Sequence, residues 1–146
     1  MKSIILVLIC VLFTSSLSAQ SLGAKLALVD TGKHYSETDP LSKRYNNIIN
    51  QLADKYIESK ERIADITVVG KKELENVGLS EPMINMMEGI LKLRDVYTIT
   101  KRYSENVSVY VIIRGRGRNH AEALAGQQSL LSQFSMETIL KTATGQ

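Results

Sequence analysis

The sequence predicts a predominantly α protein: a small helical domain with one long N-terminal amphipathic helix, followed by shorter helices. An apolar stripe with helical spacing runs from residue 41 to residue 77. Beyond it, cap residues and glycines divide the chain into short segments that are typical of helices. Only one stretch, at about 96–114, is rich in residues that favour strands.

Residues 1–19 precede the domain and differ from it in character. Lys2 is followed by an apolar run at 4–13 and then by small polar residues that end in Ala19. This order is typical of a secretory signal peptide, and it resembles the bacterial Sec type. The run is shorter than the roughly 20 residues that a membrane-spanning helix needs. We therefore expect cleavage between Ala19 and Gln20, and export to the periplasm or beyond.

Export changes the composition of the mature protein. The only cysteine, Cys10, lies in the signal peptide, so the mature chain is expected to have no disulfide and no thiolate metal site. Loss of Lys2 lowers the formal net charge from +3 to +2, and so small a charge does not indicate a nucleic-acid partner. Because no second long apolar segment follows, we expect no stable membrane span after cleavage.

Residues 20–40 are expected to form a poorly ordered lead-in, since glycine, serine, threonine and charged residues dominate them. A short apolar patch at 26–29 is available to dock on the domain. Residues 41–146 then make a single helical domain.

The long helix is expected at about 41–77, and Gly78 is a natural residue to end it. Ser59 and Gly70 interrupt its stripe, and β-branched residues before Gly70 make a break there the alternative. The stripe consists of Leu41, Tyr45, Ile48, Leu52, Tyr56, Ile63, Ile66, Leu74 and Val77.

A shorter helix is expected from Ser80, as its N-cap, to about residue 93. Pro82 is tolerated in a first turn, where N–H groups lack partners. Met83, Met86 and Met87 share a face of this helix. Thioethers bind Cu(I), but methionine on an amphipathic helix is more typical of core filler or of a contact surface.

Residues 96–114 allow two interpretations. Two β-rich runs separated by Ser104, Glu105 and Asn106 resemble a hairpin, which would make the fold α+β. A helix over about 102–114 is favoured because an isolated hairpin is only marginally stable and the surrounding segments are helical.

The stretch RGRGRNH at 114–120 is interpreted as the corner between that element and a further helix. Asn119 and Glu122 have the spacing of a capping box, and Gly115 and Gly117 suit the backbone conformations of a corner. After Phe134, a final short helix at 136–141 is expected, with Ser135 as its cap.

The same corner is the candidate site for an anion or a partner protein, through Arg114, Arg116, Arg118, Asn119 and His120. Helix N-terminal N–H groups and arginines hold phosphates or carboxylates in many proteins. The motif is not a dinucleotide fingerprint, because His120 stands where its third glycine would be, and it is not a phosphate-binding P-loop.

The sequence offers no constellation for catalysis, a metal or a cofactor. The chain has two histidines, and it lacks the paired cysteines, the HExxH motif and the GxSxG motif of common enzyme sites. The predicted function is therefore that of an exported, non-catalytic protein that binds another cell-envelope protein. The alternative is a periplasmic carrier of a small ligand or anion that uses the corner at 114–118.

Overall fold

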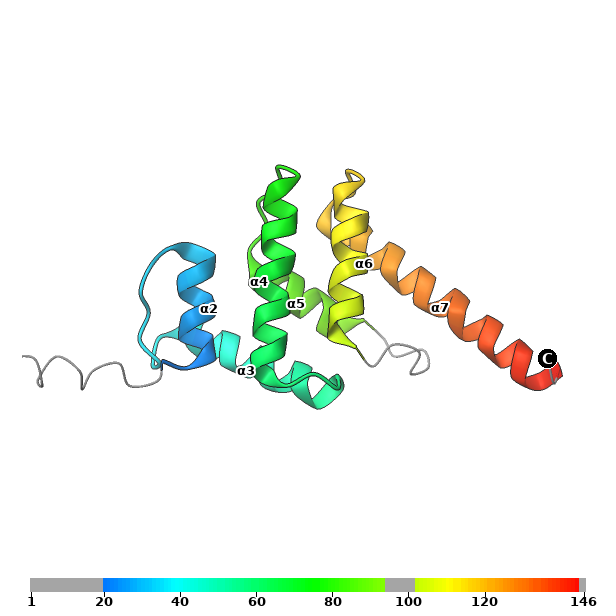
Figure 1. The fold of residues 1–146 in the computed structure, drawn as a ribbon, viewed down its shortest axis with the longest axis horizontal. Helices are drawn as coiled ribbons and strands as arrows, with labels where there is room; N and C mark the ends of the chain where they lie inside the picture. Colours follow the sequence, from blue (N-terminus) through cyan, green and yellow to red (C-terminus); the bar gives the residue numbers. More distant parts are fainter. Residues whose placement is uncertain (1–19, 94–101, 145–146) are drawn as a thin grey trace, which may run out of the picture.

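The computed structural model describes residues 20–93 and 102–144, with side chains as far as Phe134 and at Lys141. Within these residues the chain is helical and contains no strand (Figure 1). The prediction of a predominantly α domain is confirmed. The hairpin alternative is wrong over 103–114, which are helical, and residues 96–101 lie outside the described part. The helices are α2 (Leu22–Thr31), α3 (Pro40–Lys55), α4 (Lys60–Asn76), α5 (Met83–Lys92), α6 (Tyr103–Gly115) and α7 (His120–Thr144).

Helix α5 is the centre of the domain. It contacts α3, α4, α6 and α7, while α2 covers α3 and α4. Helices α4 and α6 stand side by side, and the distal part of α7 extends away from the other helices (Figure 1). Met83, Met86 and Met87 are at most 1% exposed, so the interpretation of these methionines as core filler is confirmed.

Residues 20–40 differ from the poorly ordered lead-in that the composition suggested, because residues 22–31 form α2. The Ser21 hydroxyl caps this helix by accepting a hydrogen bond from the Ala24 N–H at 3.3 Å. Gly32, at φ 72°, ends it in the left-handed conformation. Leu26 and Ala27, from the predicted docking patch, are buried against the domain. Burial of this short patch outweighs the weak helical propensity around it.

The single long helix expected at 41–77 is wrong, since two helices occupy this range. The backbone leaves the helical conformation at Tyr56 (φ −112°, ψ 162°), and α4 begins after Ser59, whose hydroxyl accepts from the Arg62 N–H at 3.2 Å. The suggested break at Gly70 does not occur, because Gly70 lies inside α4. Tyr56 and Ile63 are both buried, so the apolar stripe stays in phase across the break and conceals it.

Two other helix boundaries also differ from expectation, while the boundary at Gly78 agrees. Helix α5 begins after Pro82 rather than at a Ser80 cap. The short helix expected after Ser135 is part of α7, which is continuous to Thr144. Gly78 ends α4 as predicted: it has φ 77° and donates its N–H to the Glu75 carbonyl at 2.9 Å.

Glu58, in the link between α3 and α4, fixes the start of α6. Its carboxylate accepts from the Tyr103 N–H at 2.9 Å, from the Ser104 N–H at 3.1 Å and from the Ser104 hydroxyl at 3.0 Å. Burial raises the pKa of Glu58, but these hydrogen bonds outweigh it, and the pKa is lowered overall. The carboxylate therefore stays ionised and holds α6 beside α4.

The docking of α2 generates the first prediction. A Cβ atom at Gly23 would clash with the backbone carbonyl oxygen of Ser42 in α3, and the Gly23 N–H donates to Asn46 Oδ1 at 2.8 Å. We expect Gly23→Ala to lower the free energy of unfolding by about 1–3 kcal/mol in urea titrations, because the α3 backbone would have to move to accept the methyl group. Gly115→Ala is the control: that glycine has open space around it, so alanine should be neutral or stabilising by up to about 1 kcal/mol. Equal effects of the two changes would contradict the tight packing of α2 on α3.

Candidate functional site

The predicted corner joins α6 to α7, and its first arginine is turned inwards. Arg114 is 9% exposed. Its Nη2 lies 2.9 Å from Glu81 Oε2, and its Nη1 donates to the Arg118 carbonyl at 2.7 Å. The Glu81 side chain is only 10% exposed. The charge of Arg114 is thus balanced inside the protein, and the ion pair connects the end of α6 to the segment that precedes α5.

The other two arginines lie on the surface of the corner. Arg116 and Arg118 are exposed, and Gly117 turns the chain at φ 84°. Arg118 Nη1 lies 3.9 Å from Glu122 Oε1, a weak surface pair.

The start of α7 is occupied by its own side chains. Asn119 Oδ1 accepts from the Glu122 N–H, and Glu122 Oε2 accepts from the Asn119 N–H, both at 2.9 Å. The predicted capping box is confirmed. Because Asn119 and Glu122 already satisfy these N–H groups, less of the helix end remains for a bound anion. An anion site at the corner stays a prediction.

His120 takes part in a side-chain contact under the corner. Its Nδ1 lies 2.7 Å from the Tyr110 hydroxyl and 3.9 Å from Glu81 Oε1. Burial, and then the charge of Glu81, raise the pKa of Tyr110 to about 12. The protonated phenol and the imidazole ring share this short hydrogen bond. This arrangement connects α6 to α7.

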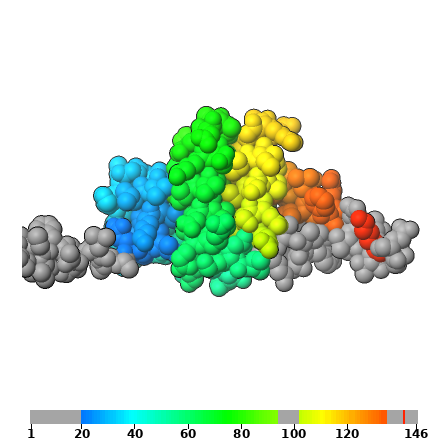
Figure 2. Space-filling view, viewed as in Figure 1, coloured from blue at the N-terminus to red at the C-terminus, as the bar shows by residue number. Residues whose placement is uncertain are grey.

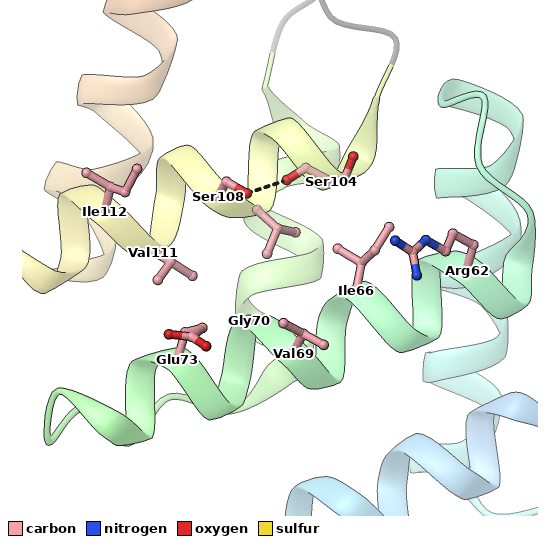
Figure 3. A pocket seen from close by; sticks show the side chains of 10 residues that line it. Arg62, Ile66, Val69, Gly70, Glu73, Ser104, Ser108, Val111 and Ile112 are labelled. Carbon is pink, nitrogen blue, oxygen red and sulfur yellow. Dashed lines mark hydrogen bonds between the residues drawn. The ribbon is translucent and has the colours of Figure 1, made fainter.

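A surface groove lies between α4 and α6 and has a volume of about 340 Å³ (Figure 3). The two helices run in the same direction, since Arg62 and Ser104 line one end and Glu73 and Ile112 line the other (Figure 3). They form adjoining parts of one face of the molecule (Figure 2). Its lining residues are Arg62, Ile66, Val69, Gly70, Glu73, Ser104, Val107, Ser108, Val111 and Ile112.

The groove has an apolar floor and an apolar rim. Ile66 and Val107 are buried at 7% and 4% exposure, whereas Val69 and Ile112 are 57% and 54% exposed. Gly70 brings the two helices close together: a Cβ atom there would lie 2.6 Å from Val107 Cγ1. The groove therefore presents apolar side chains to the solvent along its rim.

The sequence analysis did not find this groove, for a physical reason. Periodicity identifies the buried stripe of each helix, whereas Val69 and Ile112 lie off those stripes, on different helices. Single exposed apolar residues are common on protein surfaces. Only the side-by-side placement of α4 and α6 makes them parts of one site.

A second, smaller hollow lies between α6 and α7. Its volume is about 100 Å³, and its walls include Val109, Leu130, Leu131 and Phe134. Leu130 and Phe134 are 41% and 56% exposed. This hollow adds apolar surface but holds no charged pair of its own.

Two broader chemical features bear on the site. Among the described residues, no cluster of three or more histidine, cysteine, aspartate or glutamate side chains has the arrangement of a metal site. In the same part of the chain, no helix has the length and apolar character needed to cross a membrane.

The buried ion pair of the corner generates the second prediction. Glu81→Gln should lower the free energy of unfolding by about 3 kcal/mol, because it leaves the Arg114 guanidinium buried without its counter-charge. The control is Glu75→Gln, which removes a pair with Lys71 at 3.2 Å from a side chain that is 50% exposed. That change should cost under about 1 kcal/mol. If both variants lose similar amounts of stability in thermal and urea unfolding, burial does not make the Arg114–Glu81 pair more important than an exposed pair.

Comparison with known proteins adds one finding. No curated protein and no solved structure matches the chain. A family model described as MoxZ matches residues 19–130, which include the α4–α6 groove and the arginine corner. Since the match covers well over half of the sequence, the chain belongs to the MoxZ family.

Proposed function

We propose that this MoxZ-family chain is an exported, non-catalytic protein that binds another cell-envelope protein through the α4–α6 groove. The exposure of Val69 and Ile112 on the rim of an apolar groove is the observation that carries this proposal. Water at such a rim is released when a partner covers it, which favours association. The family match extends over both helices of the groove and so supports a shared surface.

The alternative, a carrier of a small ligand or anion, has weaker support. A carrier would place the corner arginines at the mouth of its cavity. The groove instead has Arg62 at one end, and Arg114 is turned towards Glu81. Arg116 and Arg118 stay exposed and are the remaining candidates for anion binding. His120 lies outside the groove, and its Nδ1 is engaged by Tyr110. The residues that line the groove therefore include no histidine, which supports a binding role for the protein over a catalytic one.

Export rests on the signal-peptide pattern of residues 1–19. The family match begins at residue 19, next to the expected cleavage point, which supports a mature chain that starts there.

Cleavage provides the third prediction. Mass spectrometry of the chain recovered from the periplasmic or extracellular fraction should show Gln20 as the first residue. Ala19→Arg should leave the precursor uncleaved, because the position before the cut requires a small residue. Recovery of the full-length chain from the cytoplasm of wild-type cells would contradict export.

The groove itself provides the fourth prediction. Ile112→Asp should reduce capture of a partner from lightly crosslinked envelope fractions at least about tenfold, because it places a charge on an apolar contact surface. Ile57→Asp is the matched control, since Ile57 is 62% exposed and lies outside the groove, between α3 and α4. Both variants should unfold at wild-type urea concentrations. Equal capture by the two variants, or recovery of the tagged chain alone, would overturn the proposed function.

A further inference from the structure

We propose that the partner segment that fills the α4–α6 groove is an amphipathic α-helix, with an acidic side chain that meets Arg62 and a basic side chain that meets Glu73. The inference rests on the proposed function, and it names the kind of segment that the partner presents. It follows from the hydrogen-bonding capacity, the shape and the charges of the groove.

Between the charged side chains at its two ends, the groove offers little hydrogen bonding to an occupant. The Ser108 hydroxyl donates to the Ser104 carbonyl at 2.9 Å (Figure 3). The Ser104 hydroxyl donates to Glu58 at 3.0 Å. Both hydroxyl protons are therefore already used, and the backbone of the walls is paired within α4 and α6. An extended peptide would bury N–H and C=O groups without partners, at a cost of about 1–3 kcal/mol each. A helix satisfies its own backbone and avoids that cost.

The shape of the groove also suits a helix. Ile66, Val69 and Gly70 form one ridge on α4, at the spacing i, i+3 and i+4. Val107 and Val111 continue the opposite wall on α6. The absence of a side chain at Gly70 lets the two ridges approach, and a third helix can then lie along the furrow between them. Helices bind such grooves through apolar anchors at i, i+3, i+4 and i+7.

The two ends of the groove carry opposite charges. Arg62 and Glu73 are eleven residues apart on α4, which is three turns or about 16 Å. Both side chains are exposed, and neither forms an ion pair with another residue in the described part of the chain. Arg62 stands in the first turn of α4 and Glu73 near its end, where the helix dipole disfavours charges of these signs. Their charges are therefore complementary to a partner rather than to α4.

A lipid acyl chain is the other occupant that needs no hydrogen bonds. Its single anionic head group would pair with Arg62, and its tail would then run past the Glu73 side chain. The loss of hydration at that carboxylate would not be compensated. Opposite charges at both ends favour a segment that carries both signs.

Labelled peptides of about 15 residues provide the test. Each is acetylated, amidated and helical, with leucines at i, i+3, i+4 and i+7, and with two charged residues eleven positions apart. The three peptides carry Glu and Lys, Glu and Glu, or Lys and Lys at these positions. Fluorescence anisotropy with the mature wild-type chain should show that the mixed peptide binds about threefold more tightly than either other peptide. The preference should disappear in about 0.5 M salt.

Charge reversal in the protein should redirect this preference. Arg62→Glu gives the groove two acidic ends, so the Lys/Lys peptide should bind best. Glu73→Lys gives it two basic ends, so the Glu/Glu peptide should bind best. The controls are Lys72→Glu and Asp65→Lys, which change the charge by the same amounts at exposed α4 positions outside the groove. Both controls should still bind the mixed peptide most tightly, as the wild-type chain does.

The failures of the two proposals can be told apart. Equal binding of all three peptides, or binding of lauric acid without any peptide, would overturn the helix and its charge pattern. If Ile112→Asp still loses the envelope partner in that case, the groove function stands. If Ile112→Asp captures the partner as well as wild type does, the proposed function itself fails.

Discussion

The burial of α5 is the constraint on which the rest of the structure depends. Every helix leaves unpaired N–H and C=O groups at its two ends, and where a helix packs against four others these groups need partners from neighbouring elements. At its start, the Met83 N–H donates to Asp30 Oδ1 of α2 at 3.0 Å. At its end, Lys55 Nζ donates to the carbonyls of Leu91 and Leu93 at 3.1 and 2.6 Å. The ends of α5 thereby fix the positions of α2 and α3 around it.

The same constraint places the groove. Helices α4 and α6 both pack against α5 and against each other, and the groove lies where their flanks meet at the surface. The Arg114–Glu81 pair holds the end of α6 against the segment that precedes α5, and Glu58 holds the beginning of α6. With both ends fixed, α6 lies parallel to α4, and Gly70 sets how closely they approach. Polar contacts at the ends of helices thus shape an apolar site between them.

The sequence predicts features that depend on near neighbours and misses those that depend on distant ones. The Asn119 capping box and the Gly78 helix end are local, and both are confirmed. The division of the long helix was concealed because Tyr56 and Ile63 keep the apolar stripe in phase. The candidate arginines illustrate the same limit. Spacing alone shows a basic corner, whereas the enclosure of Arg114 requires Glu81, which is 33 residues away.

The groove and the arginine corner also differ in what they can contribute to binding. Covering the exposed parts of Val69 and Ile112 is worth about 1 kcal/mol for each side chain, since each is about half exposed. An exposed pair made by Arg62 or Glu73 contributes less than that. Apolar contact should therefore supply most of the affinity, and the charges should fix which way the partner lies. The guanidinium of Arg114 is enclosed and paired with Glu81, so we expect it to support the fold that presents the groove rather than to contact a partner.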